Sequence, residues 1–108
     1  MGRNSKDNSL TRYEEILRIS FRYNEFMNRP KFLFLRPNYK YMGVDVNEYV
    51  KKVNGTLKCL SKEDKHILFK EFFNEKDNRE WWKKYYSKST YYRKRFFAIK
   101  RFMETYEQ

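Results

Sequence analysis

The densest run of basic side chains lies near the C-terminal end of the sequence. Between Lys83 and Arg101 there are eight Lys or Arg residues and no Asp or Glu. The 108-residue chain has 25 Lys and Arg against 14 Asp and Glu, a formal net charge of +11. Charge of this size and placement is typical of proteins that bind a polyanion, and we expect that polyanion to be nucleic acid.

The residues around this basic run follow the element order of a helix-turn-helix. The segment Arg79 to Tyr86 predicts a short helix, Ser87 is the first of several capping residues, and a longer helix then runs to about Tyr106. In such a motif the second helix presents its first turns to the major groove. The sequence therefore predicts duplex DNA as the partner.

Apolar spacing in this last helix indicates which side faces the core. The side expected to be buried carries Tyr92, Phe96, Ile99 and Met103, with Tyr91, Ala98 and Phe102 beside them. The expected DNA contacts come from the rest of the motif, namely Lys83, Lys84, Ser87, Lys88, Ser89, Thr90, Tyr91, Arg93, Lys94, Phe97, Lys100 and Arg101.

Two of these contacts have a specific expected role. Arg93 is the predicted base contact, because a guanidinium can donate two hydrogen bonds to one guanine. Tyr91 is included because its hydroxyl can reach a phosphate while its ring packs in the core. Lys100 and Arg101, two to three turns from the helix start, are expected at phosphates.

The segment SKSTYYRKRFFAIKRF resembles the recognition helix of the C-terminal, promoter-reading domain of sigma factors. The residues at matching places are Ser87, Thr90, Ala98 and Phe102. The preceding LSKEDKHILFKEFF is similar to the helix before that motif, and the resemblance covers about Val46 to Tyr106. The chain also resembles ArpU-type phage and bacterial regulators and small mollicute proteins with a similar final helix. These resemblances imply transcription control, with RNA polymerase as a further candidate partner.

The whole chain predicts an all-α fold of about five helices with no strand pair. We expect a flexible tail over 1–9, a helix with a proline-containing loop over 10–45, and a helix-turn-helix domain of the sigma C-terminal type over 46–108, on which the N-terminal helix and loop pack. One core is expected, because the chain is too short for two.

Capping residues mark where the predicted helices begin. Ser9 or Thr11 is the expected cap of the first helix, which ends before Pro30; Asp45 caps the second, and Ser61 caps the third. The segment Arg29 to Gly43 is expected to be a loop or extended linker, in which a short strand is possible, and to pack three side chains on the core, Phe32, Phe34 and Leu35. A turn is expected at 74–78, and Trp81 and Trp82 are expected to fill the core, one buried and one partly exposed.

No residue pattern points to catalysis, a cofactor or a membrane. Cys59 is the only cysteine and His66 the only histidine, so one chain cannot form a disulfide or a four-ligand zinc site. A phosphate-binding glycine loop, a nucleophile motif and a long apolar run are absent from the sequence. We expect a cytoplasmic protein that is not an enzyme.

Two other functions fit the same residues. The chain can be a protein-interaction module that uses the aromatic surface of Leu10 to Met42 to bind polymerase or another regulator. It can also bind RNA or the ribosome, because a basic helix with interleaved aromatic rings suits either nucleic acid. The number of protomers stays open.

Overall fold

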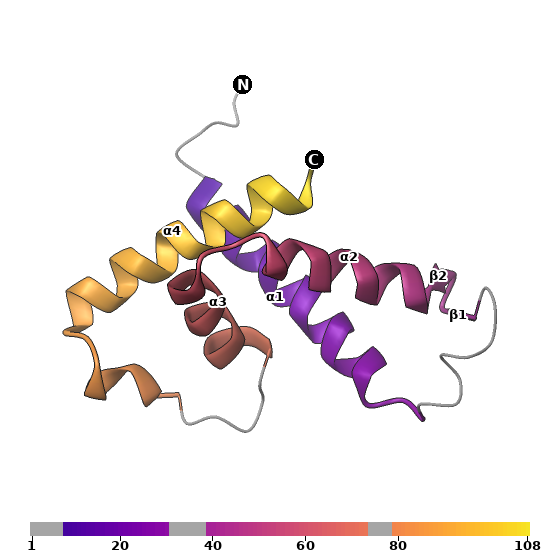
Figure 1. The fold of residues 1–108 in the computed structure, drawn as a ribbon, viewed down its shortest axis with the longest axis horizontal. Coiled ribbons are helices and arrows are strands. Elements are labelled where there is room, and N and C mark those ends of the chain that lie inside the picture. The colour runs from indigo at the N-terminus through magenta and orange to yellow at the C-terminus, as the bar shows by residue number, and fades with distance from the viewer. Residues whose placement is uncertain (1–7, 31–38, 74–78) are drawn as a thin grey trace.

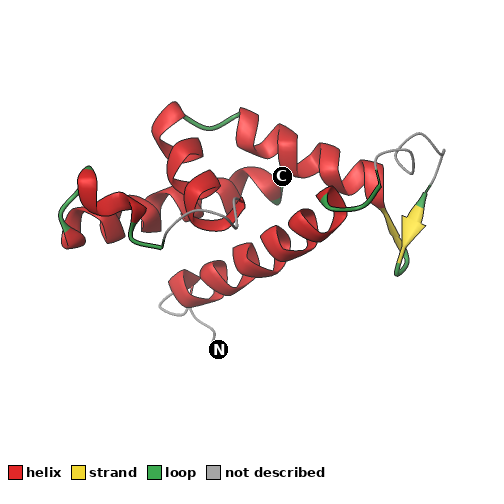
Figure 2. Cartoon of the chain, turned by 90° about the horizontal axis from the view of Figure 1, so that it is seen from below, coloured by secondary structure: helices red, strands yellow, loops and turns green. Residues whose placement is uncertain are grey.

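The computed structural model describes residues 8–30, 39–73 and 79–108. The elements in chain order are α1 (Asn8–Met27), β1 (Lys40–Tyr41), β2 (Val44–Asp45), α2 (Val46–Lys58), α3 (Lys62–Leu68) and α4 (Lys88–Tyr106). A π-helical segment, Phe69–Phe73, continues α3, and a 3₁₀ turn, Trp81–Lys84, precedes α4. Figure 2 shows how little of the described chain is strand. The predicted all-α class is confirmed at this level.

The first helix has an inner and an outer side. Ile16, Ser20 and Phe26 are buried at spacings of four and six residues, which places them on one side of α1. The helix ends at Met27, before Pro30, as predicted. It begins at Asn8, so Ser9 and Thr11 lie inside it, and the prediction that either of them is its N-cap is wrong.

A small hairpin connects to the start of α2. Strands β1 and β2 are antiparallel, with Lys40 opposite Asp45 and Tyr41 opposite Val44. Met42 and Gly43 have φ of 52° and 80°, the pair of positive angles that a type I′ turn requires. The expectation of no strand pair is wrong. The pair left no signal in the sequence, because strands of two residues are too short to show an alternating pattern.

Two predictions lie outside the described residues. They are the packing of Phe32, Phe34 and Leu35 on the core and the turn at 74–78.

The three later α-helices begin where their caps predict. The side chains of Asp45, Ser61 and Ser87 each accept a hydrogen bond from the backbone N–H three residues later. The predicted fourth helix is shorter and tighter than expected, because only Trp81–Lys84 is helical and forms one 3₁₀ turn. Within it, Trp82 is buried and Trp81 is partly exposed, as predicted.

One apolar core joins all four α-helices. It contains Ile16 of α1, Val53 of α2, Ile67 of α3 and several residues of α4. The helix α4 packs on each of the other three. The N-terminal helix therefore shares its core with the C-terminal segment. In Figure 1 the start of α4 lies at one end of the molecule and the hairpin lies at the opposite end.

Candidate nucleic-acid interface

The buried side of α4 is narrower than predicted. Five of the seven residues expected in the core are buried, namely Tyr91, Ala98, Ile99, Phe102 and Met103. Two residues predicted for the core, Tyr92 and Phe96, are 42% and 39% exposed. The prediction that they are buried is wrong.

The outer side of α4 combines basic and aromatic residues. At helical spacing it carries Ser89, Arg93, Phe96, Phe97 and Lys100. The Phe96 and Phe97 rings meet edge to face with centroids 5.1 Å apart, and Phe97 is 40% exposed. Sequence reasoning placed Phe97 outside and missed Phe96. The helical period did not separate Phe96 from the buried Ile99 and Met103, because the three residues lie at three- to four-residue spacing.

Two of the predicted DNA contacts, Lys94 and Arg101, are paired with acidic residues of α3. The Arg101 guanidinium donates to both carboxylate oxygens of Asp64, at 2.6 and 3.2 Å. The Lys94 ammonium lies 3.3 Å from Glu63 Oε1. The bond to Asp64 is the main cause of a raised Arg101 pKa. These two cations therefore fasten α4 to α3 and offer less charge to a ligand.

Tyr91 does not form part of a surface. Its side chain is fully buried, and its hydroxyl donates to Glu71 Oε1. Burial, and then the bond to Glu71, raise the pKa of Tyr91, so the phenol keeps its proton. The predicted phosphate contact of Tyr91 is wrong, because a hydroxyl inside the core cannot reach a ligand.

The free cations gather at the beginning of α4. Lys84, Lys88 and Arg93 are exposed and form no ion pair with any described residue. Ser89 is exposed beside them. The N-terminal end of a helix also carries partial positive charge and free backbone N–H groups. This end of α4 is therefore where an anion meets the least competition.

Most of the remaining predicted DNA contacts interact with other side chains of the chain. Lys83 lies 3.1 Å from Glu80, and Lys100 lies 3.7 Å from Glu104; both pairs are on the surface. Surface pairs of this kind are weak, so a stronger anionic ligand can displace them. The Ser87 hydroxyl donates to Thr90 Oγ1 at 3.0 Å while it caps the helix. Ser87 and Thr90 thus fix the geometry of the helix start.

A groove runs along the side of α4 that faces α3. Its volume is about 290 Å³, and its lining is mixed in charge, with Glu63, Asp64, Arg93, Lys94, Phe97 and Arg101. The two carboxylates make its α3 wall unsuitable for a phosphate. Arg93 and Phe97, one turn apart, form the other wall. A nucleic acid would therefore contact the outer edge of this groove.

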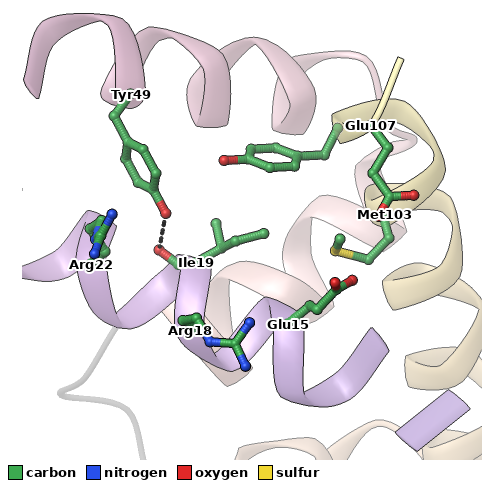
Figure 3. Close-up of a pocket in the computed structure, with 8 residues that line it drawn as sticks. Glu15, Arg18, Ile19, Arg22, Tyr49, Met103 and Glu107 are labelled. Atoms are coloured by element: carbon green, nitrogen blue, oxygen red, sulfur yellow. Dashed lines mark hydrogen bonds between the residues drawn. The ribbon is translucent and has the colours of Figure 1, made fainter. Parts of the chain in front are cut away.

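A second hollow, of about 220 Å³, lies between α1, α2 and the end of α4 (Figure 3). Arg18 and Arg22 of α1 and the hydroxyl end of Tyr49 line it. The Tyr49 hydroxyl donates to the carbonyl oxygen of Ile19 at 3.3 Å. Burial raises the pKa of Tyr49 and that of Tyr106, the last residue of α4, so both phenols are protonated at neutral pH. Neither phenol can act as a base there.

Cys59 and His66 have no arrangement that suggests chemistry. Cys59 is exposed directly after α2, and His66 lies edge to face against the Trp81 ring. Within the three described ranges, no three His, Cys, Asp or Glu side chains are grouped as a metal site would need. None of the helices in those ranges is long and apolar enough to cross a lipid bilayer.

No family model, curated protein or solved structure matches this chain. The resemblance to sigma C-terminal domains stays a prediction.

Proposed function

We propose that this chain binds duplex DNA through the outer side of the first half of α4. The observation that carries the proposal is the position of Arg93. Its side chain is exposed and free of ion pairs with described residues, whereas Lys94, Arg95 and Arg101 pair with acidic side chains of other helical segments. A free guanidinium one to two turns from a helix start can reach base edges in a major groove.

The neighbours of Arg93 suit the same contact. Ser89 and Phe97 lie one turn before and one turn after it on the same side of α4. A hydroxyl can bond to a base or a phosphate, and a phenylalanine ring can contact a thymine methyl group. Lys84 and Lys88, next to the helix start, are placed to contact the backbone. Control of transcription, which the resemblance of 87–102 to a sigma recognition helix implies, is part of this proposal.

The test separates base recognition from charge. A site is first selected from random duplexes, and affinity is then measured for that site and for a scrambled duplex at one salt concentration. Arg93→Lys keeps the charge but cannot donate a bidentate pair of hydrogen bonds to one guanine. We therefore expect it to lose about 1–3 kcal/mol of discrimination at one base pair and to keep most nonspecific binding. Lys51→Ala, at an exposed position of α2 without an ion pair to described residues, is the matched control and should change neither affinity.

Two results would contradict the proposal. Equal losses for both duplexes in Arg93→Lys and Arg93→Ala would reduce Arg93 to a phosphate contact. A wild-type chain that prefers no duplex sequence at all would remove sequence-specific recognition.

A second candidate is binding to unpaired bases of RNA or single-stranded DNA. The observation in its favour is the exposed ring pair, Phe96 and Phe97, between the cations Arg93 and Lys100. Aromatic rings beside basic residues form stacking surfaces for unpaired bases. Competition of a labelled duplex with single strands of the same length distinguishes the two. Preference for the single strand, lost in Phe97→Ala, would favour this candidate.

A further inference from the structure

A second exposed apolar surface lies at the hairpin end of the molecule. Among the described residues, the two most exposed large apolar side chains are Met42, at 79%, and Phe21, at 70%. They come from different elements, the hairpin turn and α1, yet both line one groove of about 220 Å³. Buried Phe26 and the Tyr41 ring also line this groove.

The groove is held in shape by contacts that hold the hairpin against α1. The Phe26 and Tyr41 rings meet edge to face at 6.0 Å. The Arg29 guanidinium lies over the same Tyr41 ring, 3.5 Å from its centroid. The backbone N–H of Val46 donates to the carbonyl of Tyr39, which ties the hairpin to α2. A preformed groove costs a ligand less ordering than one that must assemble.

Met42 occupies a backbone position that its side chain does not favour. Its φ of 52° lies in the left-handed region, where Asn and Gly are the usual residues of a type I′ turn. The side chain contributes little to the core, because most of it is exposed. Strain held at a residue with no packing role points to a role in contact with something else.

The charges around the groove select the kind of occupant. Arg18 and Arg22, one turn apart on α1, are exposed and have no ion pair with a described residue. Glu25, the acidic residue among those that line the groove, lies 3.8 Å from Arg29. The rim therefore offers positive charge. A second copy would bring the same arginines face to face, which disfavours self-association.

We propose that this groove, lined by Phe21 and Met42 and edged by Arg18 and Arg22, docks an acidic amphipathic segment of a partner protein. One apolar side chain of the segment fits between Phe21 and Met42, and its carboxylates meet the two arginines. The hairpin that carries Met42 lies at the other end of the molecule from the start of α4 (Figure 1), so the chain can hold nucleic acid and this partner together. The inference does not depend on the proposed DNA binding.

Selection from random peptides displayed on phage tests the proposal without assuming a partner. The immobilised full-length chain should enrich peptides that combine Asp or Glu with a large apolar residue. The selected peptides, made synthetically and labelled, are then titrated with the wild type and with variants by fluorescence anisotropy. Phe21→Ser and the double variant Arg18→Ala with Arg22→Ala should each raise the Kd about tenfold or more.

Two further variants keep the result interpretable. Met42→Gly removes the side chain and relieves the positive φ, so it should melt no lower than wild type and still bind more weakly. Phe69→Ser removes an apolar side chain of similar exposure, 50%, on the π-helical segment and should leave the Kd unchanged.

Three results would overturn the proposal. The first is enrichment of peptides without acidic residues, or of peptides that Phe21→Ser and Met42→Gly bind as well as wild type does. The second is a dimer in sedimentation experiments that Phe21→Ser abolishes, since the occupant is then a second copy. The third is binding to phosphatidylglycerol vesicles that the same variants lose while peptide binding is absent.

Discussion

At the scale of single residues, Glu71 holds three parts of the fold together. One carboxylate oxygen accepts from the Tyr91 hydroxyl and from the Trp81 ring N–H, the latter at 3.3 Å; the other lies 3.3 Å from the Arg95 guanidinium. The acid comes from the π-helical segment, and its donors come from the 3₁₀ turn and α4. A partly buried carboxylate with three donors joins these elements at defined positions.

The Tyr91 hydroxyl should contribute measurably to stability. Tyr91→Phe removes a donor to a charged acceptor within the core, so we expect a loss of about 1–3 kcal/mol in the free energy of unfolding. Urea denaturation followed by circular dichroism measures it. Tyr92→Phe is the matched control, because Tyr92 is its neighbour and its hydroxyl has no hydrogen bond to a described residue; it should change stability very little. Equal effects would mean that the Glu71 bond is not formed.

Asp64 is expected to limit nucleic-acid affinity while it stabilises the fold. Asp64→Asn weakens the bidentate bond to Arg101 and should cost about 1–2 kcal/mol of stability. The same change frees Arg101, so nonspecific DNA affinity should rise. The rise should be larger than the effect of adding one unit of net positive charge. Glu14→Gln changes the net charge equally at an exposed position of α1 without an ion pair to a described residue, and it is the control for that effect. A rise no larger than that in Glu14→Gln would contradict this role.

At the scale of elements, the helix starts and ends that depend on residues a few positions apart could be predicted from the sequence. Asp45, Ser61 and Ser87 mark the helix starts correctly, because a cap and the N–H it accepts from are three residues apart. The end of α1 before Pro30 follows from the same kind of local rule. The hairpin was missed because its strands are too short to show a period.

The orientation of α4 could not be read from its own residues. Two stripes fit the helical period, one through Tyr92 and Phe96 and one through Tyr91, Ala98 and Phe102, and both were expected to face the core. The second stripe also includes the charge of Arg95. In the structure that charge is paired with Glu71, 24 residues earlier, and the guanidinium also lies over the rings of Tyr13 and Tyr92 at 4.9 and 4.8 Å. A long-range partner of this kind leaves no trace in local periodicity.

Alanine substitutions along α4 test this orientation. Ile99→Ala should lower the free energy of unfolding by about 2–5 kcal/mol, because it opens a cavity in the core. Phe96→Ala removes a larger but half-exposed ring and should cost clearly less. The urea midpoints of the two variants give the comparison. A greater loss in Phe96→Ala would restore the predicted orientation.

At the scale of the whole molecule, buried phenols make stability depend on alkaline pH. Burial is the leading cause of the raised pKa of five tyrosines, Tyr23, Tyr49, Tyr86, Tyr91 and Tyr106. In the unfolded chain these phenols titrate near pH 10. Above that pH the folded state binds more protons than the unfolded state, so stability falls as pH rises. The stabilising contribution is complete below pH 10 and is lost through the range in which the folded-state phenols titrate.

The alkaline loss should be smaller when one of these phenols is removed. Urea midpoints measured between neutral pH and about pH 11 should fall less steeply for Tyr49→Phe than for wild type. Tyr85→Phe is the control, because that side chain is exposed. Parallel curves for wild type and Tyr49→Phe would show that the buried phenol does not titrate with folding.

The distribution of charge over the molecule sets how strongly salt should weaken the proposed DNA binding. A chain with a net charge of +11 would suggest a steep dependence, yet the ion pairs between α4 and α3 remove Lys94 and Arg101 from the contact. Lys84 and Lys88 remain free, and the weak surface pairs of Lys83 and Lys100 can give way to a phosphate. With Arg93 at the bases, ~4 phosphates are neutralised and log affinity should fall against log salt with a slope of about −3.6. Titrations of a labelled duplex at several salt concentrations give this slope.

Three variants test which cations contribute to the slope. Lys88→Ala should make it shallower by about 0.9, and Asp64→Asn should make it steeper by about the same amount because Arg101 becomes free. Lys51→Ala, on α2, should leave it unchanged. If Asp64→Asn leaves the slope as it is while Lys88→Ala flattens it, Arg101 lies outside the interface and the contact is confined to the first turns of α4. If Lys51→Ala flattens it as much as Lys88→Ala does, the bound surface is not α4.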